Sequence, residues 1–244
     1  MTLTDQIFES IRYDIVMGIH PIGDRLPSER ELTEKYNASR FAVREAIAKL
    51  IQSGFVATLP QSGTYVLDFV NDGSIETLVQ MLRIRRQIDA QTLESLLRFR
   101  LQTETEAAAE AAMYINDKDI EYLSDLLYQK ESSCLSIPDL VENDYLFHHY
   151  VIHISKNTVT QLVFKSFKPV YTFFTEFFYS LEGAKASSQR LNNRLFLVLK
   201  QGDSLAAAKA MADVIRNGEK YITSAIKKSE QSKIFLPTGE ERLR

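Results

Sequence analysis

The sequence predicts a mostly α-helical protein, with an N-terminal winged helix-turn-helix and a C-terminal all-helical bundle of about seven helices. Two observations predict this fold class. Within the first 67 residues, helical patterns and one β-hairpin pattern follow one another in the order typical of a winged helix. Beyond residue 74, apolar residues recur almost everywhere at helical spacing. The 244 residues are enough for two domains.

A linker between the two domains is predicted from the turn residues of the segment DFVNDGS. We therefore divide the chain into four parts. They are the winged helix at 1–67, the linker at 68–74, the helical domain at 75–230 and a C-terminal tail at 231–244.

The first helix is expected at 3–17, because Ile7, Ile11 and Ile15 recur at helical spacing and Gly18 ends the pattern. The next two helices are predicted from their first residues.

Ser28 and Glu31 have the spacing of a capping box, which predicts a short helix at 28–35. Ser39 is the expected N-cap of a third helix at 39–53.

Gly54 is expected to end the third helix. The β-rich runs 55–59 and 64–67 flank the turn residues 60–63, and this arrangement predicts a hairpin, the wing. Seven further helices are expected after it. They span 74–87, 90–114, 117–134, 138–155, 158–181, 187–200 and 203–228.

Composition excludes several classes of protein. No run approaches the roughly 18–20 apolar residues of a membrane helix, and the N-terminal segment lacks the apolar stretch of a signal peptide. The single cysteine, Cys134, suits a reducing compartment, so we expect a cytoplasmic protein without membrane contact. The net charge of −3 does not exclude DNA binding, because only the charge of the binding face matters.

The third helix is the candidate DNA-reading helix. The first turn of this helix in a helix-turn-helix meets base edges in the major groove. Arg40 and Arg44 lie four residues apart on one face, and arginine can bind guanine through two hydrogen bonds. Ser39 would meet a phosphate at the helix start, and Arg30 could reach groove or backbone. Alternatively, these arginines form ion pairs with Glu34 or Glu45 on a solvated face.

The predicted wing tip is small and polar, as contact with phosphates or the minor groove requires. The candidate DNA-binding residues are Arg30, Ser39, Arg40, Phe41, Ala42, Arg44, Gln61, Ser62, Gly63 and Thr64.

The segment GDRLPSERELTEKYNASRFAVREAIAKLIQSGFVATLPQSGTYV resembles the DNA-binding domain of the GntR family of bacterial repressors. The matching positions are Gly23, Leu26, Pro27, Ser28, Glu29, Arg30, Leu32, Ser39, Arg40, Val43, Arg44, Ala46, Leu50, Gly54, Gly63, Thr64 and Val66. Phe41 and Pro60 depart from the pattern, so the operator sequence does not follow from the resemblance. The resemblance implies a homodimer bound to double-stranded DNA with a pseudo-palindromic operator.

The helical domain resembles the FadR-type effector domain of this family, which has two subtypes. One binds a divalent metal through an Asp-x-x-x-His pair and two later histidines, and the metal anchors a small carboxylate. Asp144 and His148 match that pair, but Asn192 and Val214 fall at the two later positions. We therefore expect no cofactor; a divalent metal, if bound, would be held weakly by Asp144, His148 and Asn192. Alternatively, Asp144 and His148 form a buried hydrogen-bonded pair.

The second subtype binds a long-chain acyl-CoA and lacks the metal site. Resemblance to it involves Arg100 and the element NGEKYI, which contains Asn217 and Tyr221. An arginine on an apolar helix needs an anionic partner, either a ligand or an internal glutamate. Aromatic residues on several sides of 158–181 either line an acyl tunnel or form plain core. The candidate effector-binding residues are Arg100, Asp144, His148, Tyr171, Phe174, Asn217 and Tyr221.

These patterns favour a sequence-specific transcriptional regulator whose operator binding is controlled by a small effector, a fatty acyl-CoA. The alternative is a metal-dependent repressor that responds to a small carboxylate. An enzyme that uses Asp144 and His148 is the third possibility, but no catalytic constellation or glycine-rich phosphate loop accompanies the pair.

Overall fold

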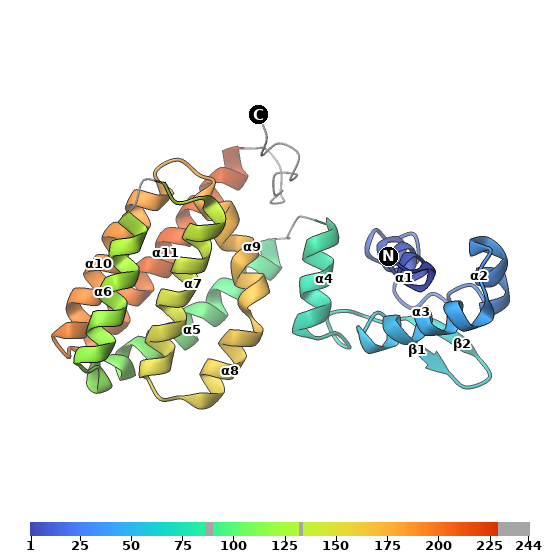
Figure 1. The fold of residues 1–244 in the computed structure, drawn as a ribbon, viewed down its shortest axis with the longest axis horizontal. Coiled ribbons are helices and arrows are strands. Elements are labelled where there is room, and N and C mark those ends of the chain that lie inside the picture. The colour runs from blue at the N-terminus through green and yellow to red at the C-terminus, as the bar shows by residue number, and fades with distance from the viewer. Residues whose placement is uncertain (86–89, 132–133, 229–244) are drawn as a thin grey trace. The chain divides into compact units, whose positions relative to one another are not determined.

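The computed structural model describes residues 1–85, 90–131 and 134–228, which form eleven helices and one two-stranded sheet (Figure 1). The prediction of a mostly helical chain with an N-terminal winged helix and a C-terminal bundle is confirmed. The chain divides into two compact units, Met1–Arg86 and Gln87–Arg244. None of the described helices is long and apolar enough to cross a membrane.

The N-terminal unit is the winged helix. Its elements are α1 (Leu3–Val16), α2 (Glu29–Tyr36), α3 (Arg40–Gln52), β1 (Val56–Leu59), β2 (Gly63–Val66) and α4 (Ile75–Arg85). The two strands are antiparallel, and their register runs from Val56 opposite Val66 to Leu59 opposite Gly63. The core of this unit contains Ile7, Ile11, Ile15, Leu32, Val43, Ala46, Leu50, Phe55 and Val66.

Local capping signals set the helix starts as predicted. The Ser28 hydroxyl accepts a hydrogen bond from the Glu31 amide, and the Glu31 carboxylate accepts one from the Ser28 amide, so the capping box forms. Ser39 caps α3 through the amide of Ala42. Gly54 lies just beyond α3 with a φ of +72°, a conformation that favours glycine.

The helix α4 differs from the expected domain assignment. We expected residues 75–87 to begin the helical domain after a linker at 68–74, but α4 belongs to the N-terminal unit. The buried Thr77 hydroxyl donates to the Ser53 carbonyl, and the Arg85 guanidinium donates to the Val16 carbonyl. These bonds satisfy carbonyls at the ends of α1 and α3, so α4 is held against the winged helix.

The C-terminal unit is a bundle of seven described helices. They are α5 (Ala90–Tyr114), α6 (Asp117–Glu131), α7 (Ile137–Ile154), α8 (Thr158–Ser166), α9 (Lys168–Tyr179), α10 (Ala184–Lys200) and α11 (Ser204–Lys228). α11 packs along α5 and α10, while α7 contacts α5, α6 and α9 (Figure 1). The predicted domain end at 230 and the tail at 231–244 lie outside the described residues.

The helix expected at 158–181 is in fact two helices, α8 and α9, which meet at Phe167. Pro169 explains the break. It has no amide hydrogen to donate to the Lys165 carbonyl, and its ring would clash with that carbonyl in a continuous helix. In the observed break, Pro169 occupies the first turn of α9, where its missing amide has no consequence.

Candidate DNA interface and effector pocket

The start of α3 presents three exposed side chains, Arg40, Phe41 and Arg44. Phe41 is 75% exposed, which is unusual for a phenylalanine and leaves its ring available to a partner. Ser39 precedes them as the exposed N-cap. The structure therefore brings these predicted DNA-binding side chains together on one helix end.

The arginines at this surface differ in their present partners. Arg44 pairs with Glu29 at 2.7 Å and Arg30 pairs with Glu34 at 3.1 Å. Within the described residues, Arg40 forms no ion pair. Exposed pairs such as these contribute little to stability, so a phosphate or a base can displace the glutamates. The alternative in which Arg40 and Arg44 pair with Glu34 or Glu45 is not what the structure shows, because Arg44 pairs with Glu29 and Glu34 pairs with Arg30.

Ala42 was a candidate DNA-binding residue, but its side chain faces the core. Its side chain is only 8% exposed and belongs to the core of the unit, while its amide donates to the Ser39 hydroxyl. Ala42 shares a helix face with Ala46 because the two residues are four positions apart, and that face points inward. Its side chain is therefore part of the core and not of the exposed surface at the start of α3.

The wing tip follows a tight path. Gln61 has a φ of +62° and Gly63 a φ of +134°. A Cβ atom at Gly63 would lie 2.5 Å from Nε of Arg25, so the glycine lets that side chain pack on the wing. Ser62 and Thr64 are partly buried, and the Thr64 hydroxyl bonds to that of Thr58 across the hairpin at 2.9 Å.

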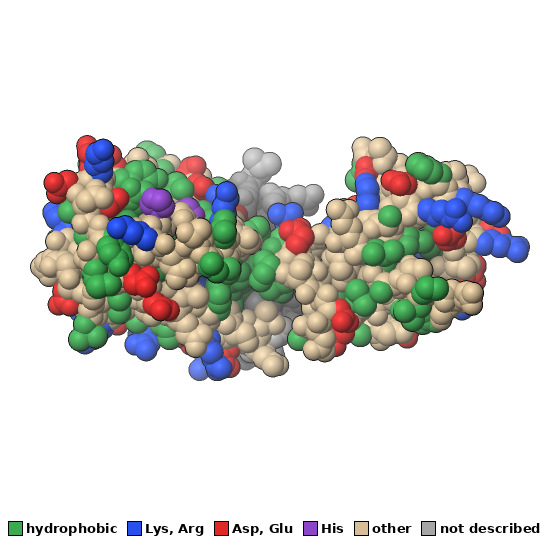
Figure 2. All heavy atoms as spheres, turned by 90° about the horizontal axis from the view of Figure 1, so that it is seen from below, with side chains coloured by type: hydrophobic (Ala, Val, Ile, Leu, Met, Phe, Trp, Pro, Cys, Tyr) green, Lys and Arg blue, Asp and Glu red, His purple; other side chains and the backbone are tan. Residues whose placement is uncertain are grey.

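Arg25 is a further candidate for DNA contact, absent from the candidate residues given above. It lines a cleft of about 290 Å³ between the start of α2 and the wing, together with Ser28 and Gln61. Lys and Arg side chains gather at this end of the unit, with acidic side chains among them (Figure 2). The GDRLPSER segment contains this arginine, but its packing on the wing depends on the hairpin and was not visible in the local pattern.

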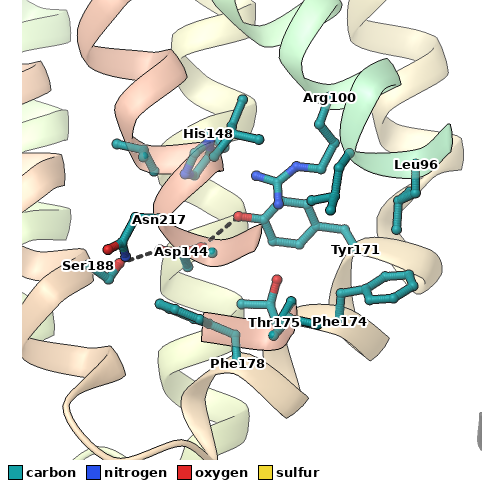
Figure 3. A pocket seen from close by; sticks show the side chains of 15 residues that line it. Leu96, Arg100, Asp144, His148, Tyr171, Phe174, Thr175, Phe178, Ser188 and Asn217 are labelled. Carbon is teal, nitrogen blue, oxygen red and sulfur yellow. Dashed lines mark hydrogen bonds between the residues drawn. The ribbon is translucent and has the colours of Figure 1, made fainter. Parts of the chain in front are cut away.

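The C-terminal unit contains a cavity of about 40 Å³ enclosed by α5, α7, α9, α10 and α11 (Figure 3). Six of the seven candidate effector-binding residues line it, namely Arg100, Asp144, His148, Tyr171, Phe174 and Asn217. Tyr221 does not line the cavity, because its ring packs edge-on against Phe178. Leu96, Thr175, Ser188 and Gly218 also line it and were not predicted.

Asp144 is the centre of the polar floor of this cavity. Its carboxylate accepts hydrogen bonds from the hydroxyls of Tyr171 at 2.6 Å and Tyr179 at 2.8 Å. Lys130 donates to the same carboxylate at 2.5 Å and to Ser188 at 2.9 Å. Burial alone would raise the pKa of Asp144, but the Lys130 and His148 charges and these hydrogen bonds hold it well below its usual value.

The second polar group is a chain of three side chains. Arg100 donates to Glu104 at 2.5 Å, and the same carboxylate contacts Nδ1 of His148 at 2.5 Å. Glu104 is fully buried, which alone would raise its pKa, yet the charges of Arg100 and His148 keep that pKa below its usual value. Of the two anionic partners considered for Arg100, the structure contains the internal glutamate.

Asp144 and His148 are both buried, but they do not form the hydrogen-bonded pair considered above. Each has its own partner, Lys130 for Asp144 and Glu104 for His148. Nε2 of His148 is buried and has no hydrogen-bond partner among the described residues. A general base in which Asp144 orients His148 would need a hydrogen bond between the two side chains, and the described residues show none.

The aromatic residues of α9 divide between cavity and core. The Tyr171 ring is fully buried, and the Arg100 guanidinium lies over it at 4.4 Å (Figure 3). Phe174 and Phe178 line the cavity, whereas Phe173 packs against Phe174 and does not. Some aromatic side chains of α9 therefore line the cavity, and Phe173 belongs to the core.

Comparisons with known proteins agree with this architecture. A family model described as bacterial regulatory proteins of the gntR family matches residues 3–66, and an FCD domain model matches residues 95–217, half of the chain. The chain belongs to the GntR family and is of the FadR type. The family and the relatives below consist of transcriptional regulators, and no catalytic family is indicated.

Among the relatives of this GntR-family chain is the transcriptional regulator Mce2R of Mycobacterium tuberculosis. It is 27% identical over 215 residues, which cover 88% of this chain and 89% of the relative. The fatty acid metabolism regulator protein of Shewanella putrefaciens is 26% identical over 194 residues, 80% of this chain and 77% of that protein. The structure of Lar, which controls expression of the agr system in Listeria monocytogenes, shares the fold with a TM-score of 0.62. It is 18% identical and matches 91% of this chain and 98% of its own.

Proposed function

We propose that this GntR-family regulator acts in the cytoplasm as a homodimer that binds a pseudo-palindromic operator and responds to a fatty acyl-CoA. Two identical reading heads on a two-fold dimer match the two half-sites of such an operator. The exposed Arg40, Phe41 and Arg44 side chains at the start of α3 support major-groove contact.

The lining of the cavity is the observation that carries the choice of effector. Leu96, Phe178 and Ile222 contribute to an apolar wall, while Arg100 and Asn217 belong to the polar floor. A ligand with an apolar chain and a polar carbonyl end is complementary to such a pocket. The relative from Shewanella putrefaciens that is named a fatty acid metabolism regulator adds support for an acyl effector.

The present cavity of about 40 Å³ has space for only a few water molecules. An acyl chain therefore requires that α9 and α11, which form most of the apolar wall, move apart. The effector would then favour an open bundle over the closed one, and it controls DNA binding only if the two states differ in operator affinity.

Titration calorimetry with palmitoyl-CoA tests this proposal, with free coenzyme A as the control ligand. We expect saturable binding of one palmitoyl-CoA per chain and much weaker binding of coenzyme A. Gly218 offers a blocking variant, because it lines the cavity and a Cβ placed there meets no described atom within 4 Å.

Gly218→Leu should fill the cavity and abolish palmitoyl-CoA binding, while Gly218→Ala should retain it. Both variants should bind the operator as wild type does. Undiminished binding of palmitoyl-CoA to Gly218→Leu would place the ligand elsewhere, and no binding to the wild-type protein would refute the acyl-CoA proposal.

A small carboxylate is the second candidate effector. It is favoured by the small size of the cavity and by Nε2 of His148, which is buried without a hydrogen-bond partner in the described part of the chain; His148 lines the same space as Arg100. A thermal-shift survey of two- to six-carbon hydroxy and keto acids distinguishes the two candidates. Stabilisation by one of them, lost in Gly218→Leu, would favour this alternative over the acyl-CoA.

A further inference from the structure

Lys130 is an unusual residue in this bundle because its side chain is completely buried. Lysine is almost never fully buried unless its charge is paired. It extends from α6 to Asp144 on α7 and Ser188 on α10, at 2.5 and 2.9 Å from its ammonium nitrogen. The ammonium group therefore lies between three helices whose residues are far apart in the sequence.

The Lys130 ammonium group already binds the Asp144 carboxylate, which a metal ion at this position would need as a ligand. Besides Lys130 and the two tyrosines, Ser188 at 3.4 Å and Asn192 at 3.3 Å also approach Oδ1 of Asp144. Four of these five donors approach Oδ1, and Tyr171 donates to Oδ2 at 2.6 Å, so both oxygens of the carboxylate already accept hydrogen bonds within the protein. A divalent cation at this position would also face the Lys130 charge at close range, in a site with little water to screen it.

The other candidate metal ligands are incomplete. Nδ1 of His148 contacts Glu104, which leaves only Nε2. Asn192 directs its amide nitrogen at Asp144, and Val214 has no donor atom. Zinc and similar ions require at least three protein ligands, and the described residues contain no group of three His, Cys, Asp or Glu that could hold an ion. The residues present do not fit a divalent metal.

We propose that Lys130 takes the place of a bound divalent cation in this bundle. Its ammonium group supplies the positive charge that neutralises Asp144 and links α6, α7 and α10. The effector pocket is therefore independent of metal, and Lys130 is the residue that excludes a metal ion. This assignment holds for either candidate effector, because it concerns the floor of the pocket and not the ligand.

The test measures metal binding to the full-length protein after chelation and dialysis, by calorimetry with Zn²⁺ and by the visible absorption of bound Co²⁺. The wild-type protein should bind neither ion tightly. The variant Asn192→His adds a third ligand but retains Lys130, and it should also fail to bind. The double variant Asn192→His/Lys130→Met should bind both ions at least 100-fold more tightly than Asn192→His alone.

Three results would overturn the proposal. One is uptake of one Zn²⁺ per wild-type chain that is lost in His148→Gln. Another is equal metal affinity of Asn192→His with and without Lys130→Met. The third is a folded double variant, verified by its circular dichroism spectrum, that binds no metal. If the double variant does not fold, the wild-type measurement and the Asn192→His variant still decide the question, because metal binding by either one contradicts exclusion by Lys130.

Discussion

Asp144 shows how single residues decide the chemistry of the bundle. Its carboxylate connects α7 to Lys130 on α6, Tyr171 and Tyr179 on α9 and Ser188 on α10. A buried charge that loses its partner destabilises a protein far more than the pair itself stabilises it. The polar floor is therefore expected to be sensitive to any change that removes one charge and leaves the other.

Asp144→Asn should destabilise the protein by about 3–5 kcal/mol at pH 7, because Lys130 remains buried without an anion. The pKa of Asp144 is lower in the folded protein, so its contribution is complete above the unfolded-state pKa of about 4 and is lost as the pH falls towards the folded value. Thermal unfolding at several pH values should show a gap between wild type and variant that narrows below pH ~4. A constant gap from pH 7 to pH 3 would contradict the assigned charge pairing.

The reading arginines give a second prediction for single residues. Arg40→Ala and Arg44→Ala should each weaken binding to a selected operator by about 1–3 kcal/mol without changing the melting temperature. Arg98→Ala is a matched control, because Arg98 is 67% exposed and paired with Glu94, as Arg44 is 66% exposed and paired with Glu29. Fluorescence anisotropy with labelled duplex measures the affinity, and wild-type affinity in both reading-helix variants would refute this role for α3.

Among the elements, α4 differs most from its predicted position, because it belongs to the N-terminal unit and not to the helical domain. It packs on the winged helix through Thr77, Gln80 and Arg85, which bond to Ser53, Arg12 and Val16. Gly54 allows this close approach, since a Cβ there would lie 2.9 Å from the Thr77 hydroxyl oxygen. The end of α3 and the start of α4 are thus joined at one point.

Gly54→Ala should therefore destabilise the N-terminal unit more than Gly18→Ala does. Both glycines have positive φ, which should cost alanine about 1–2 kcal/mol at either site, but a Cβ at Gly18 meets no described atom within 4 Å. In a protein that also carries Thr77→Ala, Gly54→Ala should cost less stability, because the side chain that its Cβ would meet is shorter. A double-mutant cycle, with stabilities measured by urea unfolding, gives this coupling between the two positions. Equal losses at Gly18 and Gly54 would show that α4 is not held there.

At the scale of the whole molecule, the proposed effector control requires a free-energy coupling between the two units. The reading arginines lie in Met1–Arg86 and the cavity in Gln87–Arg244. Linkage requires that, if an effector weakens operator binding by some factor, the operator weakens effector binding by the same factor.

We expect palmitoyl-CoA to change operator affinity by roughly 5–150-fold, and operator DNA to change palmitoyl-CoA affinity equally. Anisotropy measures the first quantity and calorimetry on the DNA complex the second. Gly218→Leu is the control and should show no effect of palmitoyl-CoA on operator affinity. Palmitoyl-CoA that binds the wild-type protein without changing operator affinity would contradict its role as the effector.

Much of the winged helix could be predicted from the sequence because its signals are local. The Ser28 and Glu31 capping box, the Ser39 cap and Gly54 each act within a few residues, and the structure shows all of them. Pro169 was an equally local signal for the break between α8 and α9 that the helical periodicity concealed.

The sequence by itself determined the order of the elements in the winged helix and six of the fifteen residues around the cavity, since periodicity and family pattern depend on near neighbours. Only the tertiary structure decided that α4 belongs to the winged helix, that Ala42 faces the core and that Lys130 neutralises Asp144. These features depend on which side chains meet after distant helices pack. From the sequence alone, Lys130 would be assigned to the surface, because lysine is rarely buried; its burial follows only from the packing of α7 and α10 around it.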